Sequence, residues 1–210
     1  MNRTPRASAL AATVALLVAA ACSGGGDDVP VDGEGAGSGG TFVAAISAQP
    51  DQLDPHQTTA YASFQVLENV YDTLVVPDPD DLTFEPSLAT DWETSEDGLT
   101  WTFTLRDDVT FHDGSEFDSA DVVYTFRRII DEELQNAYRF ATVEDIRAPD
   151  ATTVEFVLSE PTPNLLDHVG SYKGVAILPE GAAEELDLAT EANGTGPFQL
   201  EGMSADSITL

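Results

Sequence analysis

Positive charge is what this sequence has least of. Lys173 is the only lysine in 210 residues, and eight Lys and Arg residues stand against 38 Asp and Glu residues, for a net charge of −30. A protein of this charge repels phosphate backbones and anionic lipid surfaces, and no basic cluster is present to overcome that repulsion. The composition therefore argues against nucleic-acid binding. We interpret the acids as a solvated surface, of which adaptation to high salt is a narrower version and attraction of a cationic ligand the weaker alternative.

Cysteine and histidine are almost as scarce. Cys22 is the only cysteine, so no disulfide can form within the chain. His56, His112 and His168 lie far apart, and none has a second histidine or cysteine at the spacing that metal ligands need. The sequence therefore predicts no metal site.

Catalytic motifs are missing as well. Acid pairs such as Glu132 and Glu133 carry no information about acid–base catalysis in a chain this acidic. The glycines of residues 170–174 have the wrong spacing for a nucleophile elbow, and those of residues 194–196 lack the third glycine of a dinucleotide loop. We predict no catalytic residues and no cofactor.

The first 21 residues have the layout of a secretory signal. Arg3 and Arg6 precede a run from Ala7 to Ala21 that has no charge and ends in small residues. This run is too short to span a membrane. The sequence LLVAAAC resembles the lipobox of bacterial lipoproteins, which implies that the Cys22 thiol carries a lipid anchor. A buried free thiol, or a leader cleaved after an A-x-A sequence, is the alternative.

Residues 22–40 read as a flexible tether. Eight glycines and four acids lie between Ser23 and Gly40, a composition too polar to pack into a core. Random-coil scaling gives such a segment a root-mean-square reach of roughly 20–25 Å. That reach is enough to lift a folded domain off lipid headgroups.

The segment from Phe84 to Ile130 has the most regular pattern. Hydrophobic residues alternate with threonine from Leu99 to Leu105, which predicts a strand with one buried face, and Asp113-Gly114 predicts a turn. Asp118 is a predicted helix N-cap, with Asp121 in the first turn. The apolar residues that follow share one helical face: Val122, Val123, Phe126, Ile129 and Ile130.

The remaining elements are predicted from shorter patterns, and no internal repeat is present. A hydrophobic content of 42% is enough for a core. Expected strands are Thr41–Ser47, Val143–Ala148, Val154–Leu158, Val175–Leu178, Phe198–Leu200 and Ser207–Thr209, and the third pairs with the second as a hairpin. Expected helices are Tyr61–Leu74, a segment starting at Thr162-Pro163, and Gly181–Leu186.

Several of these segments together resemble one protein family. They are, in order, QPDQLDPH, LENVYDTLV, PSLATDWE, SEDGLTWTFTLRDDVTFHDG, DVVYTFRRI, LSEPTP and GTGPF. Their order and residue sequences resemble those of the extracellular solute-binding proteins of family 5, the oligopeptide, dipeptide and nickel receptors of ABC importers. The resemblance covers residues 41–210.

The resemblance implies a fold and a domain organisation. The expected fold is α/β, a type II periplasmic-binding-protein-like lobe with a mixed sheet and an inserted α+β subdomain at about residues 58–170. GTGPF is the expected link from the subdomain back to the lobe, and FHDG is an expected turn that contains His112. The second lobe, which holds most of the charged groups that fix peptide termini in the family, is expected beyond Leu210.

The resemblance also implies a function. The expected protein is a lipid-anchored receptor on the outer face of the cell membrane or in the periplasm, which binds peptides or other small solutes and delivers them to ABC permease subunits. The ligand-cleft candidates are Thr58, Thr59, Ala60 and Tyr61. Two alternatives remain open: a secreted, acid-rich hydrolase, and a lipoprotein of the same fold in a structural or signalling role.

Overall fold

The computed structural model describes residues 40–81, 83–171 and 173–210. The predicted signal peptide, Cys22 and residues 22–39 of the predicted tether lie outside this range. Contacts divide the chain into two units, Met1–Val43 and Ala44–Leu210, and the fold below is that of the second. No helix in the described residues is long and apolar enough to cross a membrane.

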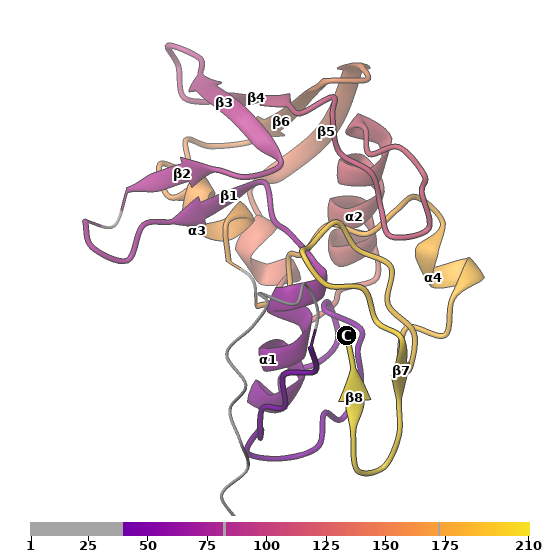
Figure 1. The fold of residues 1–210 in the computed structure, drawn as a ribbon. Helices are drawn as coiled ribbons and strands as arrows, with labels where there is room; N and C mark the ends of the chain where they lie inside the picture. Colours follow the sequence, from indigo (N-terminus) through magenta and orange to yellow (C-terminus); the bar gives the residue numbers. More distant parts are fainter. Residues whose placement is uncertain (1–39, 82, 172) are drawn as a thin grey trace, which may run out of the picture. The chain divides into compact units, whose positions relative to one another are not determined.

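The second unit contains short helices and strands in mixed order (Figure 1). The helices are α1 Tyr61–Val70, α2 Ser119–Asp131, α3 Leu165–Val169 and α4 Ala182–Glu185, with a 3₁₀ turn at Ala137–Phe140. The strands are β1 Val75–Pro77, β2 Phe84–Pro86, β3 Ala89–Thr94, β4 Thr100–Leu105, β5 Val143–Asp150, β6 Thr153–Leu158, β7 Gly202–Met203 and β8 Ile208–Thr209.

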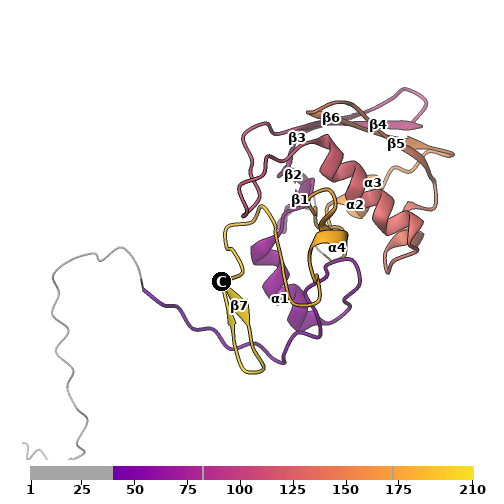
Figure 2. The ribbon, with the colours of Figure 1, turned by 90° about the vertical axis from the view of Figure 1, so that its right-hand side faces the viewer.

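The main sheet has four strands in the order β3-β4-β6-β5, and α2 lies against one face of it (Figure 2). In β4 the alternation works as predicted, because Trp101, Phe103 and Leu105 are buried while the threonines between them lie on the other face. The expected hairpin of β5 and β6 forms, and Phe103 pairs with Val154 across β4 and β6. Every strand pair in the described residues is antiparallel.

Helix α2 begins as the sequence predicted. Asp118 accepts a hydrogen bond from the backbone N–H of Ala120 at 2.7 Å, and the Asp121 carboxylate accepts one from the backbone N–H of Asp118 at 2.8 Å, which completes a capping box. Burial raises the pKa of Asp121. On the predicted apolar face, Val122, Phe126 and Ile129 are buried, and Val123 and Ile130 are partly buried.

A second hydrophobic cluster forms around α1. Leu67 of this helix and Tyr71 just after it pack with Leu53, Leu178 and Leu188. The helix is shorter than predicted because Tyr71 adopts an extended backbone, with φ −120° and ψ 154°. The β7–β8 hairpin lies beside α1 (Figures 1 and 2), where its side chains pack partly buried against this cluster.

Three predicted strands do not form. Residues 41–47 make no strand, and each is exposed. Val175–Leu178 is buried as expected, but its backbone bonds run mainly to side chains: Thr125 accepts from the Leu178 N–H at 3.0 Å. Phe198–Leu200 is irregular and leads into β7, and Phe198 is half exposed. These three short segments are thus buried at one site, and none of them pairs as a strand.

Candidate functional site

The four predicted cleft residues lie in the loop before α1 and at its first turn. Thr58 is buried, and its hydroxyl donates a hydrogen bond to Asp51 at 2.7 Å. Thr59 is exposed, Ala60 is partly buried, and Tyr61 exposes 64% of its surface. Two of the four side chains, those of Thr59 and Tyr61, are therefore available to a ligand, while Thr58 holds the loop in shape.

Asp51 organises this loop. One carboxylate oxygen of Asp51 accepts hydrogen bonds from the hydroxyls of Thr58 and Ser63, both at 2.7 Å, and from the backbone N–H of Gln52 at 2.9 Å. These bonds favour the ionised carboxylate, so they lower the pKa of Asp51. The Thr58 hydroxyl also accepts from the Ala60 N–H at 3.1 Å, which restrains the chain just before α1.

Beneath the loop, Asp54, His56 and Arg128 form a buried polar cluster. Arg128 of α2 donates to both oxygens of Asp54, at 3.2 and 2.7 Å, and to Nδ1 of His56 at 2.8 Å. His56 Nε2 donates to the carbonyl oxygen of Ala176 at 2.8 Å, so the neutral imidazole carries its proton on Nε2. Each of the three residues exposes at most 6% of its surface.

The protonation states in this cluster follow from burial and pairing. Burial lowers the pKa of His56 to about 4. Burial by itself would raise the pKa of Asp54, but hydrogen bonds and charge from Arg128 outweigh it and hold this pKa below its ordinary value. Arg128 stays charged, since its bonds to Asp54 raise its pKa despite burial. The cluster therefore holds one ion pair and one neutral histidine at neutral pH.

This cluster is structural, and the sequence analysis missed it. Both ring nitrogens of His56 are occupied by protein groups, and no serine or cysteine bonds to the ring, so the triad-like composition has no nucleophile. The cluster ties the loop before α1 to α2 and to the 175–178 segment. A signal was present in the sequence: Asp121, Thr125 and Arg128 follow the i, i+4, i+7 spacing of one helical face.

The GTGPF segment crosses tightly over the end of α1. The backbone N–H groups of Gly196 and Phe198 donate to the carbonyls of Val70 and Asn69, at 2.9 and 3.0 Å. A Cβ atom on Gly194 would overlap the carbonyl oxygen of Val70. Only glycine allows so close an approach of two backbones.

The turn containing His112 holds this crossing from the other side. The His112 backbone N–H donates to the Gly194 carbonyl at 3.0 Å, and its Nε2 donates to the Gly196 carbonyl at 2.8 Å. The Asn193 amide donates to the Asp113 carboxylate at 2.7 Å. The prediction that His112 is a turn residue is confirmed, and the structure adds a second role, because its ring joins the turn to the crossing.

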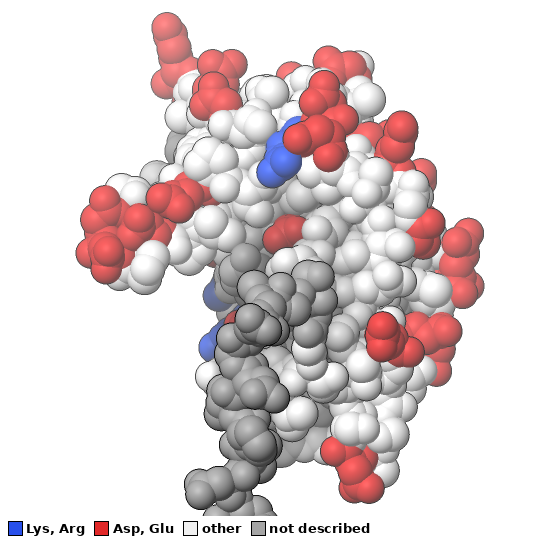
Figure 3. All heavy atoms as spheres, viewed as in Figure 1, with Lys and Arg blue, Asp and Glu red and all other residues white. Residues whose placement is uncertain are grey.

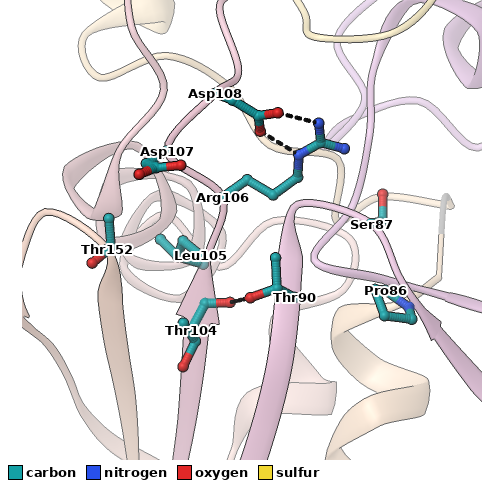
Figure 4. A pocket seen from close by; sticks show the side chains of 9 residues that line it. All are labelled: Pro86, Ser87, Thr90, Thr104, Leu105, Arg106, Asp107, Asp108 and Thr152. Atoms are coloured by element: carbon teal, nitrogen blue, oxygen red, sulfur yellow. Dashed lines mark hydrogen bonds and ion pairs between the residues drawn. The ribbon is translucent and has the colours of Figure 1, made fainter.

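Two shallow hollows lie at the end of β4, and the second also reaches the crossing. The first, of about 640 Å³, is lined by Pro86, Ser87, Thr90, Thr104, Leu105, Arg106, Asp107, Asp108 and Thr152 (Figure 4). The second, of about 480 Å³, shares Arg106 and Asp108 and reaches Asp72 and Thr195. Arg106 donates to both oxygens of Asp108 at 2.8 and 3.0 Å, so its charge is already paired. Neither hollow includes the predicted cleft residues 58–61.

Residues 40–81, 83–171 and 173–210 contain no group of three or more His, Cys, Asp or Glu side chains that could hold a metal ion. The remaining histidine, His168, shares a hydrogen bond with the Asn164 amide at 2.9 Å. Among the described residues, the polar groups around Asp51 and Arg128 position the loop before α1, and those around His112 position the GTGPF crossing.

Comparison with known proteins decides the family. The model for bacterial extracellular solute-binding proteins, family 5 (middle part), matches residues 83–210. The chain belongs to this family. The motifs that carried the resemblance in the sequence therefore identified it correctly.

Two curated relatives show what share of a longer protein this chain matches. It is 32% identical over 186 residues to the peptide transport periplasmic protein SapA of Salmonella typhimurium, a match that covers 76% of this chain and 34% of that protein. It is 30% identical over 197 residues to the dipeptide-binding protein of Escherichia coli, covering 80% and 36%. The chain thus spans about a third of the length of these relatives.

Solved structures of the family confirm the fold class. The periplasmic binding protein DppA from Helicobacter pylori, in complex with the peptide STSA, matches with a TM-score of 0.68 and 31% identity over 77% of this chain and 36% of that one. A nickel ABC transporter protein from Bacillus halodurans matches with a TM-score of 0.62 and 34% identity over 73% and 30%. The described fold is therefore part of a type II periplasmic-binding-protein lobe.

Proposed function

We propose that this chain is part of the solute-binding component of an ABC importer, which captures peptides or similar small solutes outside the membrane and delivers them to the permease. The observation that carries the proposal is the family match over residues 83–210, together with the likeness to a binding protein solved with a bound peptide. The named relatives are transport-binding proteins rather than enzymes. Because the chain spans a third of those relatives, its ligand and its permease are proposals.

In this proposal the loop at residues 58–61 lines the ligand cleft. Thr59 and Tyr61 face outward from a loop that Asp51 restrains and that the Arg128 cluster anchors from below. A preformed loop of this kind loses little conformational entropy when a ligand binds. Residues 58–170 would then form the inserted subdomain, and the GTGPF crossing its return to the lobe.

Isothermal titration against a pool of dipeptides and tripeptides tests the proposal. We expect a chain extended by the genomic sequence downstream of Leu210 to bind, and the 210-residue chain to bind much more weakly, because such receptors close two lobes around the ligand. No binding by the extended chain to peptides or other small solutes would overturn the proposal. Equal, tight binding by both would show that the whole site lies within residues 41–210.

The membrane anchor is a separate part of the proposal. We propose that residues 1–21 are removed and that the Cys22 thiol is lipidated, which leaves the protein on the outer face of the membrane; the support is the single cysteine after an uncharged leader. A Cys22→Ala variant should then appear in the soluble extracellular or periplasmic fraction. Retention of this variant in washed membranes would contradict the anchor.

The two alternative functions gain no support. Among the described residues, the buried histidine has no nucleophile bonded to it, and each of the named relatives is a transport-binding protein. Neither a hydrolase nor a structural lipoprotein is favoured by a specific observation.

A further inference from the structure

Lys173 is one of two exceptions to the charge pattern of the described residues. Of the six basic side chains in the described residues, four lie within 4.0 Å of a carboxylate: Arg106, Arg127, Arg128 and Arg147. Lys173 and Arg139 have no such partner in the part of the chain that the structure describes. In a chain with 38 acids, an exposed ammonium group would be expected to lie beside a carboxylate, and that of Lys173 does not.

The ammonium of Lys173 lies at the predicted ligand loop. Its Nζ is 6.0 Å from the centre of the Tyr61 ring, within the range of a cation–π interaction. At this distance the ring accepts none of the ammonium's N–H groups in a conventional hydrogen bond. Three N–H donors therefore stay available to water or to a ligand.

The backbone around Lys173 is held in place. The Asn136 amide donates to the Lys173 carbonyl at 2.8 Å. Gly174 follows with φ 90°, and a Cβ atom there would collide with the Asn136 amide and approach the carbonyl oxygen of Pro55. This segment therefore packs between Asn136 and the loop before α1, so the fold fixes the backbone from which the Lys173 side chain reaches Tyr61.

We propose that Lys173, positioned by Tyr61, is an anion subsite that receives a carboxylate of the bound solute. The inference rests on the proposed function and narrows it to carboxylate-bearing ligands. An ammonium that has no carboxylate partner can bind an incoming carboxylate without first breaking an ion pair. Elsewhere the surface field of this chain is negative and repels anions, so this group also orients a carboxylate-bearing ligand toward the loop.

The sole lysine makes the subsite directly observable. With ¹³Cε-lysine, the 210-residue chain gives a single side-chain NMR signal, which remains sensitive to weak, millimolar binding. The probes are the dipeptides Ala-Glu and Ala-Gln and the amide of Ala-Gln, which carry two carboxylates, one and none. We expect the Lys173 signal to shift with Ala-Glu and Ala-Gln and to stay in place with the amide. A shift of equal size with the amide would overturn the inference.

Variants of the extended chain separate the subsite from general electrostatics. By calorimetry, Lys173→Gln should weaken Ala-Glu binding about fivefold, the upper end of what an exposed ion pair supplies, and leave the amide unaffected. Lys173→Arg should restore most of the affinity. Arg147→Gln, the same charge change at an exposed residue of β5, should have no effect.

The outcomes distinguish the two proposals. Binding of Ala-Glu that is insensitive to Lys173→Gln, or equally sensitive to Arg147→Gln, would overturn the anion subsite and leave a peptide receptor standing. Absence of binding by all three probes and by the broader peptide pool would overturn both.

Discussion

Arg128 and Asp54 form a two-point ion pair in which both side chains are almost fully buried, with 4% and 3% of their surfaces exposed. The shorter of the two bonds, from Arg128 Nη2 to Asp54 Oδ2, is 2.7 Å long. Asp54 lies in the loop before α1, and Arg128 lies in α2, 74 residues later. The pair therefore joins the loop before α1 to the helix that packs against the main sheet.

Removing one member of this pair should destabilise the protein strongly. An Arg128→Met variant leaves the Asp54 carboxylate buried without its partner, which costs about 3–5 kcal/mol of unfolding free energy. Arg127→Met is the matched control, because Arg127 pairs with Asp145 on the surface, and it should cost less than about 1 kcal/mol. Urea unfolding of both variants measures the difference. Equal, small losses would show that the buried pair is not holding the loop.

Acid should weaken the fold through His56. The pKa of this buried imidazole is about 4, against 6.5 for an ordinary histidine. Between these values the unfolded chain binds a proton that the native protein does not, so the unfolding free energy falls as the pH falls from 6.5 to about 4. The loss approaches about 3 kcal/mol at the lower end.

Comparing the wild type with histidine variants isolates the contribution of His56 to this pH dependence. Burial also lowers the pKa of His168, which acts in the same direction, while burial raises that of Asp121, which acts in the opposite direction. Both groups remain in a His56→Gln variant, so the difference in pH dependence between wild type and variant belongs to His56. We expect His56→Gln to flatten the curve between about pH 6.5 and pH 4.5, and His168→Gln to leave most of it. Parallel curves for wild type and His56→Gln would refute the assignment.

Patterns within a short stretch predicted local structure well. The alternation of β4, the Asp118 cap of α2 and the turn at Asp113-Gly114 depend on neighbours in sequence, and each formed as expected. Val175–Leu178 was predicted to be buried and is, but burial did not imply a strand. Its carbonyl and N–H groups find Thr125 and His56, which are 53 and 120 residues away. No local pattern contains that information.

The candidate site likewise has a part that could be predicted from the sequence and a part that could not. The loop at residues 58–61 came from the resemblance, whereas the cluster that anchors it depends on contacts between Asp54, His56 and Arg128 that sequence spacing does not reveal. The spacing of Asp121, Thr125 and Arg128 is visible in the sequence, but the predicted face of α2 contains apolar residues alone. A polar stripe beside an apolar one on the same helix indicates a second packed surface.

The crossing over α1 should not accept a side chain. Gly194→Ala would place a Cβ atom against the carbonyl oxygen of Val70, which cannot move without disturbing the end of α1, and should cost at least about 2 kcal/mol. Gly202→Ala in β7 is the control, because nothing lies within 4 Å of its added Cβ, and it should change stability by less than about 0.5 kcal/mol. Thermal unfolding of the two variants tests this. Similar melting temperatures for both would mean that the crossing is looser than the structure indicates.

The C-terminal end of helix α2 contains a residue, Glu133, whose replacement should stabilise the protein. Glu133 adopts φ 53°, a left-handed conformation that favours glycine. Its N–H and that of Leu134 donate to the carbonyls of Ile130 and Ile129, at 3.2 and 3.0 Å, the bonds of a Schellman motif. Glu133→Gly should therefore raise the unfolding free energy by about 0.5–1 kcal/mol.

Two further substitutions separate backbone conformation from charge. Glu133→Gln keeps the strained backbone and removes a negative charge from the helix C-terminus, so it should gain only about 0.3 kcal/mol. Glu132→Gly should destabilise the protein instead. The φ of Glu132 is −88°, so glycine relieves no backbone strain there, and it increases the conformational entropy of the unfolded chain. A gain from Glu133→Gln as large as that from Glu133→Gly would show that charge, and not conformation, limits stability at this end.

Screening of the acidic surface should stabilise the fold. Without Arg3 and Arg6, 38 acids face six bases, a net charge of −32. On the face drawn in Figure 3, acidic side chains gather at the rim, including the turn between β1 and β2, where Asp78, Asp80 and Asp81 lie close together in sequence. Close carboxylates repel one another in the folded state, and salt weakens that repulsion.

The melting temperature should therefore rise between about 10 mM and about 500 mM sodium chloride, where the Debye length falls from about 30 Å to below 5 Å. Surface ion pairs such as Arg106–Asp108 act in the opposite direction, because salt weakens attraction as well. We expect repulsion to dominate, since acids outnumber bases by 38 to eight. A variant with Asn at positions 78, 80 and 81 should show a smaller rise, because asparagine keeps the turn's hydrogen-bond acceptors and removes three charges. A flat or falling curve for the wild type would mean that the acids are too dispersed to oppose folding.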